Sequence, residues 1–257
     1  MSSRINAVRI HAVRNTLATS AVLAVACLGM APAHAGVSGS LALTSDYLFR
    51  GVSQTNQEPA LQGGVEFAAD NGFYLGAWGS NINWLSDLST PLAPISSSLE
   101  LDGYGGYRGK FNDVVGFDVG AIYYWYPGDF PSGFNSADTA ELYVGISASV
   151  FTAKYSYALT DLFGYADSDG SGYLEANANW EFKPSWTLNA HVGKQWIENN
   201  EDFAYIDWKL GVTKGFDSGF SIALAYSDTD AEQALYTNPH GNHIADDTVV
   251  LTLSKAF

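Results

Sequence analysis

The segment Val115–Trp125, VGFDVGAIYYW, alternates between two kinds of side chain. Its odd-numbered positions are all apolar, whereas Gly116, Asp118 and Gly120 fall on the opposite side of an extended chain. A period of two residues is typical of a β-strand, while an amphipathic helix repeats every three to four. The segment therefore predicts a strand whose two faces meet different surroundings.

The same alternation recurs along the chain and predicts twelve strands. They are expected near residues 37–49, 61–67, 73–82, 99–108, 115–125, 141–150, 154–159, 174–180, 186–192, 206–213, 220–226 and 248–257. Short connections are expected at 70–72, 110–113, 149–151, 183–185 and 214–219. Long ones are expected at 51–59, 85–97, 127–139, 160–171, 198–203 and 227–245. Strict alternation of the two kinds predicts an up-and-down meander with both termini on the short-turn side.

Two all-β architectures produce such alternation. A soluble barrel or sandwich turns its apolar face inward, whereas an outer-membrane barrel turns it toward lipid and keeps polar residues in the lumen. Strands of roughly 9–11 residues and long loops opposite short turns favour the membrane version. We expect a single closed antiparallel transmembrane β-barrel of twelve strands, with short periplasmic turns and long extracellular loops.

Aromatic residues near the strand ends favour the same architecture, because transmembrane barrels carry aromatic girdles at both interfaces. Near short turns they are Phe67, Phe73, Phe111, Phe151, Phe182, Trp186, Phe216 and Phe220; near long loops they are Phe49, Trp84, Trp125, Tyr157, Trp196 and Tyr226. The chain also stops on Phe257 at the end of an amphipathic strand. That ending has the form of the C-terminal signal for outer-membrane assembly.

The first 35 residues differ from the rest. Arg4, Arg9 and Arg14 precede an apolar stretch that ends before Ala33-His34-Ala35, the pattern of a cleaved secretory signal peptide. The apolar stretch is shorter than the roughly 20 residues of a membrane-spanning helix. A lipoprotein site at Cys27 is a weaker alternative. We expect a signal peptide over residues 1–35 and a barrel over residues 36–257.

The expected mature chain is strongly acidic. Of the 12 Lys and Arg residues, three arginines lie in residues 1–35, which leaves 9 bases against 27 Asp and Glu, a formal net charge of −18. Nucleic acid is a poor partner for such a chain. Cys27, the single cysteine, lies in the leader, so no disulfide framework is expected. No cofactor motif is present.

Four stretches resemble a known family. They are SDYLFRGVSQT (Ser45–Thr55), FYLGAWGSN (Phe73–Asn81), LDGYGGYRG (Leu101–Gly109) and the terminal LTLSKAF. In these the chain is similar to the TorF-like family of proteobacterial outer-membrane porins, over essentially the whole mature sequence. The resemblance implies an outer-membrane barrel with a channel role. It implies no particular solute and no catalytic residues.

If apolar side chains face lipid, the charged strand residues face the lumen. The candidate pore-lining residues are the acids Asp46, Glu66, Glu100, Asp102, Asp118, Glu141, Glu175 and Asp207 and the bases Arg50, Arg108, Lys154 and Lys209. One interpretation is a hydrated pore that favours cations. The other is a web of ion pairs that fills a narrow barrel. Asp46 and Arg50 are expected either to form a constriction pair or to pair with charges on neighbouring strands.

Other chemical sites are weaker. Asp167–Glu175, DSDGSGYLE, resembles the start of an EF-hand loop, but Ala178 stands where the bidentate glutamate is needed. His191 is expected to form hydrogen bonds in the lumen, and metal capture by His240 and His243 is a minor option. Acidic groups in the long loops are expected to be solvated. We therefore predict no metal site.

These observations predict a passive channel in the outer membrane of a Gram-negative bacterium. Its expected partners are outer-membrane lipid, the assembly machinery that reads the C-terminal strand, and small polar solutes. A closed barrel with a structural or surface-interaction role is the alternative, and an outer-membrane barrel enzyme comes third.

Overall fold

The computed structural model describes residues 36–257, so the predicted signal peptide lies outside the described residues. Twelve antiparallel strands close into one barrel, in which β1 pairs with both β4 and β14 and every other strand pairs with its neighbours along the chain. The wall consists of β1 (Gly36–Thr44), β4 (Ala60–Ala68), β5 (Phe73–Asn81), β6 (Leu99–Lys110), β7 (Val115–Trp125), β8 (Thr139–Ala148), β9 (Phe151–Ala158), β10 (Gly172–Lys183), β11 (Trp186–Trp196), β12 (Tyr205–Gly215), β13 (Phe220–Thr229) and β14 (Thr248–Ala256). The predicted twelve-stranded meander is confirmed.

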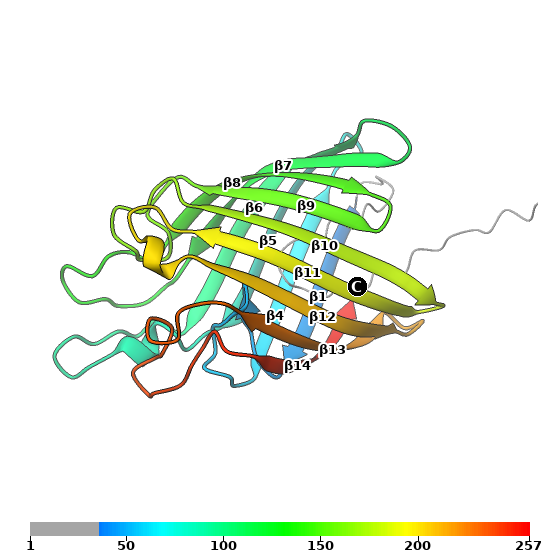
Figure 1. Ribbon diagram of the computed structural model, residues 1–257. Coiled ribbons are helices and arrows are strands. Elements are labelled where there is room, and N and C mark those ends of the chain that lie inside the picture. The colour runs from blue at the N-terminus through cyan, green and yellow to red at the C-terminus, as the bar shows by residue number, and fades with distance from the viewer. Residues whose placement is uncertain (1–35) are drawn as a thin grey trace, which may run out of the picture.

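The two ends of the barrel differ in their connections (Figure 1). At the short-turn end, residues 149–150 join β8 to β9 and residues 184–185 join β10 to β11. At the long-loop end, residues 82–98 join β5 to β6, and residues 230–247 join β13 to β14. Two short 3-10 helices, η1 (Ser86–Leu88) and η2 (Glu201–Phe203), also lie in long loops. No helix in residues 36–257 is long and apolar enough to cross a membrane.

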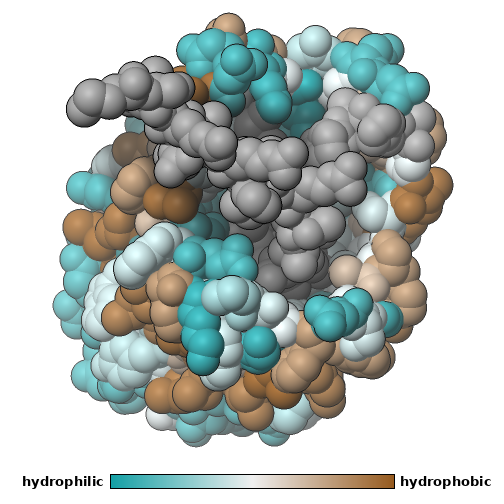
Figure 2. Space-filling view, turned by 90° about the vertical axis from the view of Figure 1, so that its right-hand side faces the viewer, coloured by the Kyte–Doolittle hydropathy of each residue, from teal (hydrophilic) through white to brown (hydrophobic). Residues whose placement is uncertain are grey.

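The outer face of the wall is apolar. Leu75 exposes 67% of its surface and Leu224 exposes 55%, and most outward-facing strand positions carry similar residues. In the view onto the short-turn end, hydrophobic residues gather along the outer wall (Figure 2). Exposure of so much apolar surface is unfavourable in water, and a closed barrel satisfies its backbone hydrogen bonds without water. The barrel is therefore built to face lipid.

Aromatic residues mark both ends of this apolar wall. Phe73 and Phe151 are exposed near the short turns, and Trp125 and Tyr157 near the long loops. Two of the residues predicted for this girdle do not belong to it: Phe49 packs on Tyr124, and Trp84 packs on Tyr126. The prediction placed them by their distance from the strand ends, which does not show on which side of the wall a loop residue lies.

Candidate functional site

The first long connection folds into the barrel. The wall strand β1 ends at Thr44, whose hydroxyl donates to the backbone oxygen of Asp46 (2.9 Å), and the chain then turns inward. Within the connection, the short strands β2 (Leu48–Phe49) and β3 (Val52–Ser53) pair with each other. We call Ser45–Thr55 the inner hairpin. Its polar residues are shielded from water, since Ser53 and Thr55 are at most 1% exposed.

The turn of the inner hairpin is formed by Arg50 and Gly51. Both have positive φ, +50° and +82°, which is the geometry of a two-residue type I′ turn. Glycine adopts this conformation freely, whereas arginine at such a position costs about 1 kcal/mol. Tertiary contacts of the Arg50 side chain must therefore offset this cost.

Those contacts lie on the far side of the barrel. Arg50 Nη2 donates to both carboxylate oxygens of Glu141 on β8, at 2.8 and 2.7 Å, and Nη1 donates to Gln195 Oε1 on β11 at 2.8 Å. The guanidinium also lies 4.4 Å from the ring centre of Tyr173 on β10. In the order of strands around the barrel, β8, β10 and β11 lie across the lumen from β1. The inner hairpin thus spans the lumen.

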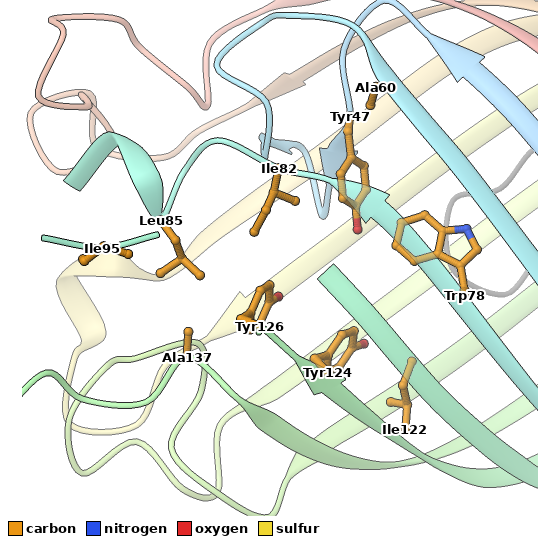
Figure 3. Packing of buried hydrophobic residues seen from close by; sticks show 10 residues of the cluster. All are labelled: Tyr47, Ala60, Trp78, Ile82, Leu85, Ile95, Ile122, Tyr124, Tyr126 and Ala137. Carbon is orange, nitrogen blue, oxygen red and sulfur yellow. The ribbon is translucent and has the colours of Figure 1, made fainter. Parts of the chain in front are cut away.

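An aromatic cluster surrounds the inner hairpin. Tyr47 lies 5.4 Å from Trp78 of β5, and its hydroxyl donates to Glu100 Oε1 at 2.9 Å. Figure 3 shows Tyr47 directed toward Trp78, with Tyr124 on β7, two strands along the wall from β5. All three side chains are at least nine-tenths buried. The long-loop half of the lumen is therefore filled with packed side chains.

The connection between β13 and β14 covers the inner hairpin from outside. Ser53 N donates to the backbone oxygen of Ile244 (2.6 Å), and Val52 belongs to a buried cluster with Tyr205 and Tyr236. Asn56 accepts a hydrogen bond from Asn238 at 2.7 Å. These contacts fix the inner hairpin between the barrel wall and the overlying connection between β13 and β14.

This arrangement corrects the predicted first strand. The sequence predicted a strand to Phe49, with Phe49 in the aromatic girdle near the long loops, and a loop from Gly51 to Pro59. Instead, the wall strand ends at Thr44, Tyr47 is 4% exposed inside the barrel, and Phe49 packs on Tyr124. The alternation continues past Thr44 because the inner hairpin is itself a two-stranded structure, but its apolar residues face lumen side chains and not lipid.

Asp46 and Arg50 do not pair with each other. One oxygen of Asp46 accepts hydrogen bonds from the hydroxyls of Ser53 (2.6 Å) and Thr55 (3.1 Å), which fixes the base of the inner hairpin. Burial raises the pKa of the Asp46 carboxyl above its ordinary value, and these hydroxyl donors act in the opposite direction. Asp46 is therefore a structural group of the hairpin, and Arg50 is its contact with the opposite wall.

Most of the other candidate residues form three groups on the inner face. Arg108 pairs with Glu66 (2.9 Å) and lies 4.0 Å from Asp118. Lys154 pairs with Glu175 (2.8 Å). The carboxylate of Asp207 accepts from the hydroxyl of Tyr173 (2.9 Å) and lies 2.9 Å from His191 Nε2.

Besides Asp46, three candidates make no ion pair within residues 36–257: Glu100, Asp102 and Lys209. Glu100 and Asp102 are 1% and 4% exposed, whereas Lys209 is half-buried. Glu100 accepts from Tyr47, but Oδ1 of Asp102 has no hydrogen-bond partner among the described residues. Outside the inner hairpin, the inner face therefore holds two buried carboxylates without a base.

The short-turn half of the lumen has a different character. Asn189 donates to Asn179 Oδ1 (2.7 Å) and accepts from Thr213 (2.7 Å), and both asparagines are half-exposed. Asn177, also half-exposed, accepts at a distance of 2.7 Å from His191 Nδ1. Uncharged amides with partial exposure line a region that water reaches.

The sequence pattern missed the buried aromatic residues of the inner face. Trp78 lies on β5, and Tyr124 lies on β7 in phase with Asp118, so its parity already pointed inward. The sequence interpretation assigned aromatic residues to the girdles and did not use this parity. The signal available in the sequence was a large aromatic residue at an inward-facing position of a strand.

The weaker candidate sites do not assemble. Glu175 pairs with Lys154 inside the barrel while Asp167 is exposed in the loop, so the EF-hand-like stretch does not converge on one point. The partners of His191 are Asn177, Tyr173 and Asp207, with no serine among them. Within the described residues, no three His, Cys, Asp or Glu side chains form a metal site.

Among the solved structures with a similar fold are porins. The chain is similar to the KdgM porin (TM-score 0.53, 10% identity), over 86% of this chain and 98% of that one. It is also similar to the NanC porin (TM-score 0.54, 11% identity), over 86% of this chain and 99% of that one. A further KdgM structure, solved in complex with disordered oligogalacturonate, has a TM-score of 0.51 at 10% identity, over 86% and 98% of the two chains. At such identities the likeness shows the fold.

Comparison with curated proteins finds no match to this sequence. A family model does match, over residues 30–257, under a description that does not carry the TorF-like name, so that resemblance stays a prediction. The match covers the entire described barrel, including the inner hairpin. The chain belongs to the bacterial family of unknown function Gcw_chp.

Proposed function

We propose that this protein is a channel for small polar solutes in the outer membrane of a Gram-negative bacterium. A closed barrel with an apolar outer face and charged groups along its inner face supports this proposal. The observation that carries it is the arrangement of the inner face itself. Arg50, Arg108 and Lys154 pair with carboxylates there, and the amides of Asn179 and Asn189 are partly exposed.

The inner hairpin is the narrowest part of the proposed channel. A twelve-stranded barrel is wider than the small filled barrels but narrower than the 16–18-stranded open porins. The hairpin spans this width and contacts β8 through Arg50. Solutes would pass beside the hairpin or displace it, so its contacts set the conductance.

We propose a preference for cations or neutral solutes. The candidate pore-lining residues comprise eight acids and four bases, and the excess of carboxylates gives the lumen a negative potential. KdgM has been solved with oligogalacturonate, a polyanion. The charge on this inner face disfavours an anionic solute. We therefore propose a different class of solute for this chain, although the fold is shared.

A closed barrel with a surface-interaction role is the second candidate, and the packing of the inner hairpin favours it. The packed rings of Trp78 and Tyr124 help to fill the long-loop half of the lumen. In this case the long loops act as the contact surface. Export through a cleaved signal peptide, residues 1–35, and assembly through the strand that ends at Phe257 are part of both proposals.

Planar-bilayer recording tests the two. Refolded protein, residues 36–257, is expected to give discrete conductance steps, and its reversal potential in a KCl gradient is expected to lie toward that of K⁺. A reversal potential toward Cl⁻ would refute the cation preference. No steps from the wild type, and none from a variant in which Arg50 no longer holds the hairpin, would support the closed barrel.

A further inference from the structure

Two carboxylates lie side by side beneath the inner hairpin. Glu100 and Asp102 are two residues apart on β6, so both point to the inner face, with Cα atoms about 6–7 Å apart. In the wall, Asp102 is in register with Trp78 on β5 and Tyr124 on β7. We call Glu100 and Asp102 the acid pair. Its surroundings include aromatic rings, Ser80 in register with Glu100, and the Glu141 carboxylate, which acts electrostatically on Asp102.

No basic side chain neutralises the acid pair. Arg50 is the base of the inner hairpin, but both oxygens of Glu141 already bind it, with Gln195 as a third partner. Tyr47 supplies one hydroxyl to Glu100. Asp102 Oδ1 is buried without any hydrogen-bond partner in the part of the chain that the structure describes. A buried carboxylate in this condition calls for a specific explanation.

Protonation or a bound cation can relieve the unfavourable free energy of this arrangement. Transfer of an ionised carboxylate into a buried site is strongly unfavourable unless an opposite charge accompanies it, and two adjacent carboxylates repel each other as well. We propose that the acid pair binds a small monovalent cation, an alkali ion or a primary ammonium group. Its consequence for transport rests on the channel function proposed above.

The chemistry of the lining favours a single positive charge. The available ligands are oxygens of the carboxylates and of the Tyr47 and Tyr126 hydroxyls, and the rings of Tyr47, Trp78 and Tyr124 belong to the surrounding buried cluster. Aromatic rings attract cations at their faces. A Ca²⁺ site takes six to eight oxygens, usually from several carboxylates. Residues 36–257 contain no such convergence of acidic groups.

The cation would also bind against the inner hairpin. Tyr47 belongs to the hairpin and Glu100 to the wall, and their hydrogen bond joins the two parts. A cation at the acid pair would reduce the repulsion between Glu100 and Asp102 next to this hydrogen bond. Occupancy of the site would therefore hold the hairpin in place.

Thermal unfolding in detergent tests the site without any need for conduction. The wild type is compared in chlorides of K⁺, Na⁺, methylammonium and the bulky cation N-methyl-D-glucamine, at one pH and one ionic strength. We expect the unfolding temperature to be about 3 °C higher in at least one small cation, at a concentration well above its Kd. The small cation that stabilises most identifies the ligand class.

Substitutions of three acids locate the effect. Asp102→Asn removes the unpartnered carboxylate and is expected to abolish the difference between cations; Glu100→Gln serves if Asp102→Asn does not fold. Glu66→Gln removes a lumenal acid that pairs with Arg108 and is expected to retain the difference. Equal unfolding temperatures of the wild type in all four salts would overturn the proposal, as would a difference that persists in Asp102→Asn.

The two proposals fail separately. A barrel that does not conduct but is stabilised by a small cation would refute the channel and leave the site intact. Conductance steps without cation-dependent stability would refute the site and leave the channel intact.

Discussion

The polar side chains in the two halves of the lumen find hydrogen-bond partners in different ways. In the long-loop half, polar groups such as Glu141 are almost fully buried and bind partners from the inner hairpin. In the short-turn half, Asn179 and Asn189 bind each other while half-exposed. Buried polar groups lose much when a partner is removed, whereas exposed groups find water instead. The loss of one hydrogen bond should therefore reduce stability far more in the long-loop half than in the short-turn half.

Removal of the Arg50 side chain should destabilise the long-loop half most. Arg50→Ala leaves the Glu141 carboxylate buried and unpaired, which is expected to destabilise the fold by roughly 3–5 kcal/mol. It also removes the contact of the hairpin with the opposite wall, so bilayer conductance should rise. Unfolding in denaturant and single-channel recording measure the two effects.

Two variants control this experiment. Lys194→Ala removes a base from the exposed outer side of β11, next to Trp196, and should change neither quantity. Arg50→Ala combined with Glu141→Gln removes the unpaired charge and should recover most of the stability while conductance stays high. If Arg50→Ala leaves conductance at the wild-type level, the inner hairpin does not constrict the channel.

The turn of the inner hairpin gives the next largest effect. A Cβ at Gly51 would lie 2.7 Å from Asp207 Cβ and 2.7 Å from Thr229 Cγ2, at a φ of +82°. Gly51→Ala combines this overlap with backbone strain and is expected to cost about 2–4 kcal/mol. The substitution should release the hairpin and so make the peptide bond that follows Arg50 accessible to trypsin.

Gly133 provides a matched control, because its φ is +83° and a Cβ there would meet nothing within 4 Å. Gly133→Ala isolates the backbone strain, about 1 kcal/mol. Equal losses of stability in the two variants would show that the tip of the hairpin is not packed against β12.

These residues also show how far the sequence predicts the structure. The wall follows from the sequence because contact with lipid imposes a period of two on every strand, as in Val115–Trp125. The inner hairpin does not, since Tyr47 and Phe49 keep the same period while facing the lumen. A period reports that two faces differ and does not report which medium each face meets. Gly51, the residue of the turn that adopts positive φ freely, was the local signal that the wall strand had ended.

The candidate site follows from the sequence only in part. Inward parity places Glu100, Glu141 and Glu175 on the inner face, but it does not assign their partners. Lys154 binds Glu175 on the paired strand β10, which register alone explains. Arg50 binds Glu141 across the barrel, and no local pattern encodes a contact between residues that far apart in the chain.

A pair of mild substitutions gives the sharpest form of the comparison between the two halves. Tyr47→Phe removes one hydroxyl and leaves Glu100 Oε1 without that donor in a dry site, at an expected cost of about 1–3 kcal/mol. Asn189→Ala removes two hydrogen bonds of 2.7 Å in the short-turn half, yet it is expected to cost less than about 1 kcal/mol because water reaches Asn179. Free energies of unfolding of the two variants, measured under one condition, decide the order. A larger loss from Asn189→Ala would mean that the short-turn half is as dry as the other, and the lumen would then lack the hydrated entrance that a channel requires.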